Sequence, residues 1–265
     1  MKKLNEKLAI ITGGAMGNGL GVAKTFLKYG ANIVILDYAK EVAKTVLDLK
    51  GMYPNQEIKG YEVDIRDKEK LENIIKEVYE NMGEIDILVN NAGVCQLETF
   101  ANMSDEVRDF HMDINIKGTW NVTKCVLPYM KKNSESSIIN LSSVTGPRVA
   151  DVGEVAYATT KAAIIGFTKA LAMELVNEKI RVNAILPGYI LTPMVEKIGE
   201  QSNPDNPREI IDGIVKGIPM KRMGTIEELG ELAAFLASNE SSYFTGAEFV
   251  IDGGSTLPET MVVGV

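Results

Sequence analysis

The amino-acid sequence predicts a single α/β domain of 265 residues, built on a doubly wound parallel β-sheet. Short apolar runs alternate with amphipathic segments along the chain, and polar or small residues follow several of these runs, as at the ligand-binding edge of such a sheet. There is no linker, repeat or low-complexity segment that would divide the chain. We therefore expect one domain over residues 1–265, with right-handed crossovers and helices on both faces of the sheet.

Seven apolar runs are short enough for buried strands, and several longer segments have helical periodicity. The predicted strands are 8–11, 31–36, 58–63, 85–89, 137–141, 181–186 and 248–251. The predicted helices are 20–29, 68–82, 105–129, 156–176 and 226–237, with a short amphipathic run at 210–218.

Composition narrows the classes of partner. The net charge is −8 and no basic stripe is present, which argues against a nucleic-acid ligand. The two cysteines, Cys95 and Cys125, cannot form a disulfide framework, and no metal-binding spacing of Cys or His occurs. No apolar run approaches the ~18 residues that a membrane helix requires. We expect a cytoplasmic protein with no metal and no membrane partner.

A glycine-rich turn follows the first predicted strand. Gly13, Gly14, Gly17 and Gly19 separate this strand from the helix at 20–29. In this context backbone N–H groups and a helix N-terminus can bind a pyrophosphate, although an ordinary tight turn has the same composition.

The second predicted strand ends in Asp37, 18 positions after Gly19. A carboxylate there can accept hydrogen bonds from the adenosine ribose hydroxyls and would repel a 2′-phosphate. Gly14, Met16 and Tyr38 offer no positive charge to offset that repulsion. The sequence therefore predicts a dinucleotide cofactor, NAD rather than NADP.

Tyr157 and Lys161 are four residues apart in a predicted helix and so lie on one face. An ammonium beside a phenol lowers a pKa that starts near ~10, which would make Tyr157 a general acid/base. A hydroxyl of Ser142 or Ser143 could hold a substrate oxygen beside the phenol. Taken alone, the pair is weak evidence, because most Tyr and Lys residues at this spacing are a packed ring beside a solvated lysine.

These residues and several others recur in one known family, and the chain resembles the short-chain dehydrogenase/reductases over essentially its full length. The matching residues are Thr12, Gly13, Gly17 and Gly19, Asp37, Asp64, the run 90–93 (Asn-Asn-Ala-Gly), Asn115, Ser143, Tyr157 and Lys161, Pro187 and Gly188 with Thr192, and 252–254 (Asp-Gly-Gly). Segments 109–124, 144–158, 202–207 and 252–260 resemble one subgroup of that family. This closer match indicates a subgroup and not a substrate.

The resemblance implies a Rossmann fold and a catalytic set of Asn115, Ser143, Tyr157 and Lys161. Tyr157 would exchange the hydroxyl proton, Lys161 would lower its pKa and hold the nicotinamide ribose, and Ser143, the later serine of the pair, would bind the substrate oxygen. Asn115 would interrupt its helix and order a water next to Lys161, or would only bend the helix.

The resemblance also implies a cofactor site, in which Asp64 bonds the adenine, Asn91 and Gly93 border the ribose and Thr192 fixes the carboxamide. Asn18 departs from the family pattern, which commonly has an apolar residue there. The implied NAD-binding residues are Gly13, Gly17, Asn18, Gly19, Asp37, Asp64, Ile65, Asn91, Gly93, Tyr157, Lys161, Pro187, Ile190 and Thr192.

Three regions are expected at the mouth of the site: 94–97, 146–155 and 192–219. Arg148, Asp151 and Glu154 either hold a polar substrate or are simply solvated. Cys95 is a substrate contact or a buried small residue, and His111 is expected to be structural. The segment 192–219, rich in proline, is predicted to be a lid that becomes ordered when ligand binds.

The tail at 255–265 is apolar and is expected to pack on a neighbouring subunit or over the site. The resemblance implies a homotetramer formed through the helices at 156–176 and 105–129 and the last strand, with Trp120 in the core or at an interface.

The leading expectation is an NAD-dependent enzyme that acts on CH–OH groups and interconverts a secondary alcohol and a ketone. The substrate is a hydroxysteroid or bile acid, or else a sugar, polyol or hydroxy acid. The alternative is a dinucleotide-sensing or scaffold protein with little turnover. A preference for NADPH is opposed by Asp37.

Overall fold

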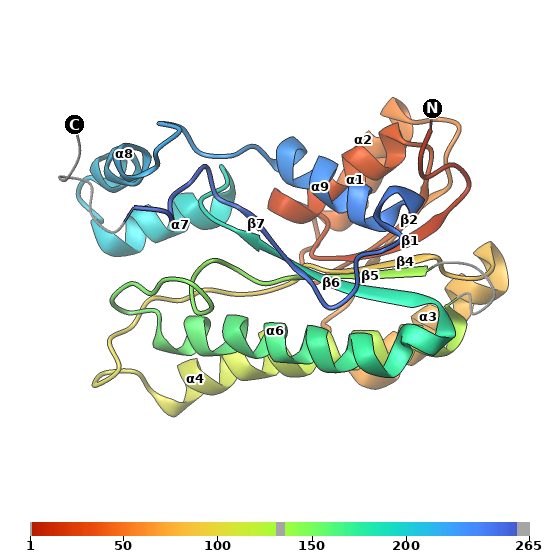
Figure 1. Ribbon diagram of the computed structural model, residues 1–265, viewed down its shortest axis with the longest axis horizontal. Helices are drawn as coiled ribbons and strands as arrows, with labels where there is room; N and C mark the ends of the chain where they lie inside the picture. Colours follow the sequence, from red (N-terminus) through yellow and green to blue (C-terminus); the bar gives the residue numbers. More distant parts are fainter. Residues whose placement is uncertain (1, 131–135, 259–265) are drawn as a thin grey trace.

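The computed structural model describes residues 2–130 and 136–258, which form a parallel sheet between two layers of helices (Figure 1). Seven strands pair in the order β3-β2-β1-β4-β5-β6-β7, and every pair is parallel. They are β1 (Leu8–Thr12), β2 (Asn32–Asp37), β3 (Ile58–Glu62), β4 (Ile87–Asn90), β5 (Ser136–Leu141), β6 (Ile180–Pro187) and β7 (Glu248–Ile251). The predicted doubly wound, seven-stranded sheet is confirmed.

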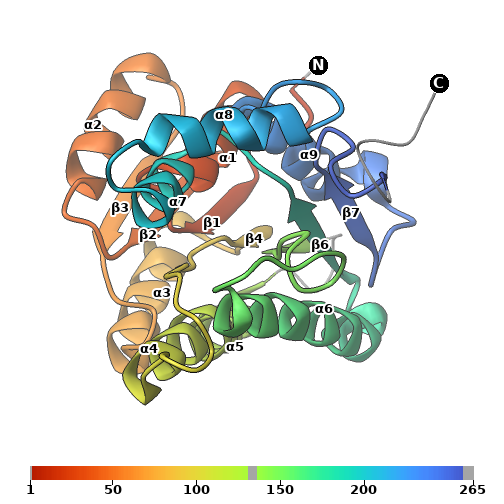
Figure 2. The same ribbon diagram turned by 90° about the vertical axis from the view of Figure 1, so that its left-hand side faces the viewer.

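The helices divide between the two faces and one edge of the sheet (Figures 1 and 2). One face carries α1 (Gly17–Lys28), α2 (Val42–Met52) and α9 (Ile226–Ala237); the other carries α3 (Lys68–Met82), α4 (Asp105–His111), α5 (Thr119–Val126) and α6 (Val155–Leu175). Two further helices, α7 (Pro193–Ser202) and α8 (Pro207–Gly217), lie beyond the carboxyl ends of the strands.

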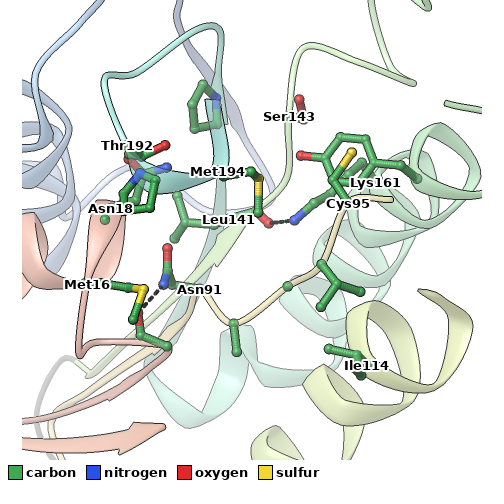
Figure 3. Close-up of a pocket in the computed structure, with 18 of the residues that line it drawn as sticks. Met16, Asn18, Asn91, Cys95, Ile114, Leu141, Ser143, Lys161, Thr192 and Met194 are labelled. Atoms are coloured by element: carbon green, nitrogen blue, oxygen red, sulfur yellow. Dashed lines mark hydrogen bonds between the residues drawn. The ribbon is translucent and has the colours of Figure 1, made fainter. Parts of the chain in front are cut away.

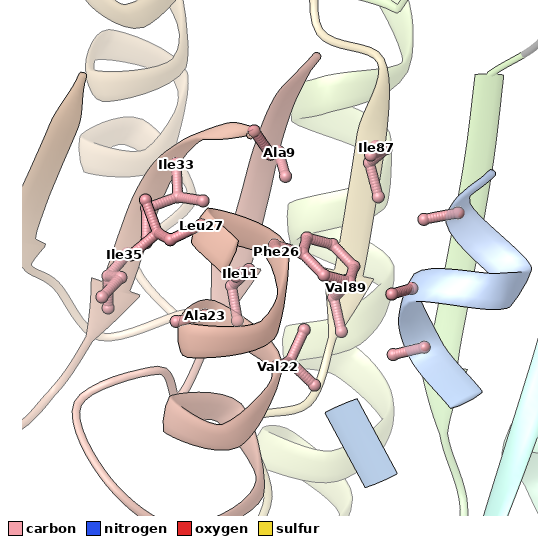
Figure 4. Close-up of a cluster of buried hydrophobic side chains, with 14 of the residues drawn as sticks. Ala9, Ile11, Val22, Ala23, Phe26, Leu27, Ile33, Ile35, Ile87 and Val89 are labelled. Atoms are coloured by element: carbon pink, nitrogen blue, oxygen red, sulfur yellow. The ribbon is translucent and has the colours of Figure 1, made fainter. Parts of the chain in front are cut away.

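Each face has its own apolar core. On the first face the Phe26 side chain of α1 packs among strand residues such as Ile11 and Val89 (Figure 4). Helices α1 and α9 can pack closely because Gly21 has no side chain. A Cβ at this position would overlap the Ile226 carbonyl. These contacts fix the position of α1, and therefore of its N-terminus, relative to the sheet.

No helix of the described residues is both long and apolar enough to cross a membrane.

The predicted helix at 105–129 is interrupted in the middle. Between α4 and α5 the chain forms a π-helical segment, η1 (Met112–Gly118), and a 3₁₀ turn, η2 (Leu127–Tyr129), follows α5. Asn115 lies in η1, so the expected local interruption at this residue is confirmed. Segments of this kind occur often at functional sites.

Two helices, α2 and α7, were not predicted as separate elements. No side chain caps α2, so the usual signal of a helix start is absent there. Helix α7 begins at Pro193 after Thr192, and proline at the first helical position is a start signal that the prediction passed over. Two short 3₁₀ turns, η3 (Val176–Glu178) and η4 (Asn239–Ser241), complete the described elements.

The chain runs from β1 to β2 and β3 on one side, then crosses to β4 on the other side of β1. A ligand crevice is expected at this reversal, outside the carboxyl ends of the strands. Thr12, Asp37 and Asn90 lie at those ends, as the sequence predicted.

Candidate active site

A cavity of about 600 Å³ lies at this edge of the sheet. It is lined by residues of the turn after β1, the ends of β2, β4, β5 and β6, and helices α6 and α7 (Figure 3). All but two of the predicted catalytic and cofactor residues line it; the exceptions are Asn115, discussed below, and Gly19, which packs against the Gly13 carbonyl within the turn.

The glycine-rich turn has a backbone that most side chains would not allow. Gly13 and Gly17 have φ angles of 63° and 55°, and a side chain at Gly19 would overlap the Gly13 carbonyl. The amide Nδ2 of Asn91 donates to the carbonyls of Thr12 at 3.0 Å and Gly13 at 2.9 Å. Asn91 therefore holds the turn from β4, while the N-terminus of α1 opens toward the cavity.

Asn18 supplies a polar atom that the chain itself does not satisfy. Its Oδ1 is buried and has no hydrogen-bond partner, and the side chain lies beside Thr192 at the cavity (Figure 3). Buried polar atoms are normally paired, so this acceptor indicates a donor on a ligand. Together with the turn described above, it fits a dinucleotide phosphate and nicotinamide end at this position.

At the opposite end of the cavity, both carboxylate oxygens of Asp37 accept backbone hydrogen bonds. Ala15 N donates to Oδ2 and Ala39 N to Oδ1, each at 2.9 Å. These bonds fix the carboxylate, and a carboxylate has further lone pairs for ribose hydroxyls.

Asp64 is bound by a cation that the sequence analysis did not place here. Arg66 donates to it from Nε at 3.0 Å and from Nη2 at 2.6 Å, and this pairing holds the pKa of Asp64 below its usual range. Arg66 lines the same cavity as Asp37. The expectation that no positive charge lies near the ribose end therefore needs correction, although the Asp64 carboxylate offsets the charge of this guanidinium.

Tyr157, Lys161 and Ser143 come together in the cavity, and Figure 3 shows Ser143 and Lys161 on the same side of it. Lys161 Nζ donates to the Leu141 carbonyl at 2.9 Å and lies 5.6 Å from the centre of the Tyr157 ring. Ser143 Oγ accepts a hydrogen bond from Thr145 N at 3.1 Å, and its hydroxyl also forms a hydrogen bond with the Tyr157 phenol.

The neighbouring Ser142 has a different part. Its Oγ donates to the Lys161 carbonyl at 2.7 Å, so this hydroxyl is engaged within the chain. The geometry therefore agrees with the choice of Ser143 over Ser142 as the group that binds a substrate oxygen.

Asn115 acts on the loop after β4. Its Oδ1 accepts from Val94 N at 2.8 Å, and its Nδ2 donates to the Val94 carbonyl and to Thr160 Oγ1, each at 3.0 Å. Gly93 brings the two groups together, since a Cβ there would lie 3.2 Å from Asn115 Oδ1 and 3.4 Å from Lys161 Nζ. Asn115 thus ties η1, the β4 loop and α6 together next to the lysine.

Burial dominates the pKa values at this end. It raises the pKa of Tyr157 well above the usual range, although the hydrogen bond with Ser143 acts in the opposite direction. Burial also lowers the pKa of Lys161 to about 8. The lowering of the Tyr157 pKa that the sequence predicted is therefore absent in the chain alone, because desolvation of the phenol is the larger effect.

The three charged residues expected at the mouth separate in the fold. Arg148 pairs with Glu248 of β7 at 3.1 Å and does not line the cavity, and Asp151 accepts a weak bond from Tyr189 at 3.4 Å. Glu154 alone lines the cavity, with a side chain that is only 7% exposed. The grouping of these three as a substrate clamp is therefore wrong for Arg148.

Cys95 and His111 are both buried but differ in role. Cys95 lines the cavity near Tyr157 and Lys161, and burial raises the pKa of its thiol to about 12 (Figure 3). His111 is bonded at both ring nitrogens, to Gln96 N at 3.0 Å and the Val107 carbonyl at 2.8 Å. His111 is structural, as predicted.

Helix α7 closes one side of the cavity, and α8 packs against α7. Their apolar contacts centre on Val195 and Ile218, and Gln201 of α7 accepts a hydrogen bond from Leu97 N at 3.1 Å across the opening. The ordering of this segment on ligand binding stays a prediction. Of the tail, residues 259–265 lie outside the described residues, and Leu257 is 83% exposed.

The sequence named Thr12 without a role, and it did not name Tyr189. Thr12 Oγ1 accepts from Asn91 N and Ala92 N, each at 3.0 Å, and so joins β1 to the β4 loop. Tyr189 lines the cavity two positions after Pro187. No local pattern marks Tyr189.

Comparisons with known proteins agree with this geometry. A family model with the description Enoyl-(Acyl carrier protein) reductase matches residues 13–256. The chain is 54% identical over 265 residues to oxidoreductase UcpA of Escherichia coli strain K12, and the match covers all of both chains. UcpA oxidoreductases are the subgroup that segments 109–124 and 144–158 resemble.

Solved structures with 30% identity share the whole fold. L-sorbose reductase from Gluconobacter frateurii, complexed with NADPH and L-sorbose, matches with a TM-score of 0.90 over 97% of this chain and 100% of that one. Levodione reductase matches with a TM-score of 0.91 over 96% of this chain and 98% of that one. The chain belongs to the short-chain dehydrogenase/reductase family, an oxidoreductase family that uses nicotinamide dinucleotide cofactors.

Proposed function

We propose that the protein is an NAD-dependent oxidoreductase that interconverts a secondary alcohol and a ketone. The observation that carries this proposal is the meeting of Tyr157, Ser143 and Lys161 in one cavity with Asp37 and the N-terminus of α1. The cavity therefore combines a proton-transfer group with a place for a dinucleotide.

The roles of the residues follow from their bonding. The nicotinamide supplies or accepts the hydride when the cofactor is bound. Ser143, which bonds the Tyr157 phenol in the chain alone, donates its hydroxyl hydrogen to the substrate oxygen, and Tyr157 exchanges a proton at that same atom. Lys161, fixed by the Leu141 carbonyl, has two further N–H groups for the nicotinamide ribose.

Asn115 positions the surroundings of Lys161 rather than touching substrate. Its bonds to Val94 and Thr160 fix the wall beside Lys161. A water ordered next to Lys161 remains our expectation from the family, and the alternative is a residue that only shapes the helix.

The choice of NAD rests on Asp37. Its carboxylate is fixed by two backbone donors and would repel a 2′-phosphate. Use of NADP is the second candidate, because Arg66 lines the same cavity and L-sorbose reductase is complexed with NADPH. We favour NAD because Asp64 already neutralises Arg66.

For the substrate we propose a sugar or polyol rather than a steroid or bile acid. Glu154, Thr145 and Tyr189 give the substrate end of the cavity a polar wall, beside apolar side chains such as Met194. The structural similarity to L-sorbose reductase supports this class.

The test begins with fluorescence titrations of NADH and NADPH, followed by a screen of NAD reduction with sugars, polyols, hydroxy acids and hydroxysteroids. Tyr157→Phe is expected to lower kcat by at least about a hundredfold and to leave the Kd for NADH unchanged, since only proton transfer is lost. Tight NADH binding without turnover on any substrate would favour the sensing alternative. Turnover retained by Tyr157→Phe would remove the phenol from the mechanism.

We also propose a homotetramer, in the cytoplasm, assembled through α5, α6 and β7. In the single chain Trp120 is 56% exposed and stacks on Phe167 of α6, so it is not part of the core. Val250 on the edge strand β7 is 42% exposed. Light scattering on the eluted protein, with Trp120→Glu as the variant, tests this assembly.

A further inference from the structure

Glu154 is a buried carboxylate that the mechanism above does not use. Its residue is 7% exposed, and its Oε2 is buried with no hydrogen-bond partner. An acidic side chain is rarely buried unless it is paired, and an unpaired buried acceptor is costly to the fold. Such a group therefore requires an explanation outside the folding of the chain.

The local structure offers none. Glu154 is the N-cap residue of α6, but its side chain accepts no capping hydrogen bond from that helix. The Thr145 hydroxyl and the Asp151 backbone lie next to the carboxylate, and they leave Oε2 unbonded. No described lysine or arginine forms an ion pair with Glu154.

The position of Glu154 points to the substrate. It precedes Tyr157 by three residues, about one helical turn, and both side chains line the cavity. Ser143, Thr145 and Tyr189 line the same end. A substrate whose reacting oxygen lies between Ser143 and Tyr157 would therefore place its neighbouring carbon atoms near Glu154.

The charges around the cavity restrict what that part of the substrate can be. Among the described residues that line the cavity, the cations are Lys161, which lies behind the phenol, and Arg66, which is held by Asp64 at the adenosine end. Asp151 stands outside the cavity beside Tyr189 and adds negative charge. A carboxylate or phosphate on the substrate would meet repulsion here, whereas a hydroxyl could donate to Oε2.

We propose that Glu154 is a specificity residue that accepts a hydrogen bond from a second hydroxyl of an uncharged substrate, next to the carbinol that reacts. The site then selects diols, polyols and hydroxyketones over simple alcohols and over hydroxy acids. This proposal rests on the proposed function, because it takes Tyr157 and Ser143 as the groups that hold the reacting oxygen.

The experiment compares two probes that share a carbon ring, cis-1,2-cyclohexanediol and cyclohexanol. Binding to the protein with NADH is measured by calorimetry, and turnover is measured by NAD reduction. In the wild type the diol is expected to bind roughly tenfold to a hundredfold more tightly, because the second hydroxyl bonds to a buried acceptor that is otherwise unpaired. Glu154→Leu should remove this difference between the two probes.

Two variants control for other effects. Glu154→Gln keeps one acceptor oxygen and should restore part of the preference for the diol. Asp151→Asn removes the nearby charge that does not line the cavity, and should leave the preference intact. Melting temperatures check folding, and Glu154→Leu should melt no lower than the wild type because it removes an unsatisfied buried group.

Each outcome is decisive. Equal binding of the two probes to the wild type, or a diol preference that Glu154→Leu retains, overturns the role of Glu154. Tighter binding of trans-2-aminocyclohexanol than of the diol overturns the assignment to a neutral hydroxyl. A diol preference in binding that depends on Glu154, with no turnover of either probe, supports the contact and counts against the proposed oxidation instead.

Discussion

Replacing Asp37 with asparagine should move the cofactor preference from NADH toward NADPH. Asparagine keeps the size of the side chain and one acceptor oxygen but removes the negative charge. In the wild type the two carboxylate oxygens each accept a backbone N–H at 2.9 Å, so the group is held in place before any ligand arrives. Its free lone pairs are then available to the ribose without further ordering.

The size of the effect follows from these bonds. A hydrogen bond to a charged group contributes ~1.5–3 kcal/mol, so its loss should weaken NADH binding by roughly 10- to 150-fold. For NADPH the variant removes repulsion between two negative charges, which at about 4 Å costs ~1 kcal/mol even in water-like surroundings. Together the two changes shift the ratio of affinities toward NADPH by about 50-fold or more.

Fluorescence titration of both cofactors with each variant measures this ratio. Asp64→Asn is the matched comparison, because it frees Arg66 in the same cavity without changing the ribose acceptor, and it should improve NADPH binding relative to NADH binding. Melting curves show whether loss of the bonds from Ala15 and Ala39 has disturbed the turn. An unchanged ratio in a well-folded Asp37→Asn protein would refute the assignment of Asp37 to the ribose.

Two further predictions separate residues that are adjacent in sequence or in space. Ser143→Ala should lower kcat by roughly a hundredfold with little change in stability. Ser142→Ala should keep kcat and lose ~1 kcal/mol of unfolding free energy, because it loses the hydrogen bond to the Lys161 carbonyl. Steady-state kinetics and urea melts compare the two variants, and a reversed pattern would exchange their roles. The pKa of Lys161 is lowered from 10.5 to about 8 by burial, so the unfolded chain binds the lysine proton more tightly than the folded one. The unfolding free energy of the wild type relative to Lys161→Met should therefore rise as the pH rises above about 8, and it should level off near pH 10.5, the pKa of the lysine in the unfolded chain. A difference that does not depend on pH would mean that Lys161 is not desolvated.

The strands were predictable because buried parallel strands read as continuous apolar runs. Every residue of β1, β4, β5 and β6 is buried, and the ends of these strands shifted by only one or two positions from the prediction. Helices with clear signals were also found, such as α9, where Thr225 and Glu228 form a capping box. Helix α2 lacks a side-chain cap, so periodicity alone did not separate it from a loop. Helix α7 does begin with a proline at its first position, a signal that the prediction passed over.

The residues of the site divide in the same way. Tyr157, Lys161, Ser143 and the glycines belong to local patterns, and the fold brings them to one cavity. Arg148 pairs with Glu248, which is 100 positions away in the sequence. Asp64 pairs with Arg66, only two positions away, but Arg66 belongs to no sequence motif and was not predicted as its partner. Charged side chains are long and their partners are chosen by the tertiary fold, so three charges in one loop did not predict one clamp.

The acid/base chemistry shows most clearly what local spacing leaves out. The four-residue spacing of Tyr157 and Lys161 predicts an ammonium that stabilises the phenolate, but the same packing that brings them together removes water from both groups. Burial then raises the pKa of the phenol and lowers that of the ammonium. In the chain alone Tyr157 keeps its proton at neutral pH and can donate it to a ketone oxygen, while the oxidation of an alcohol requires a base. The phenolate must therefore gain its stabilisation from interactions made in the ternary complex, because in the chain alone the bond from Ser143 does not offset the effect of burial.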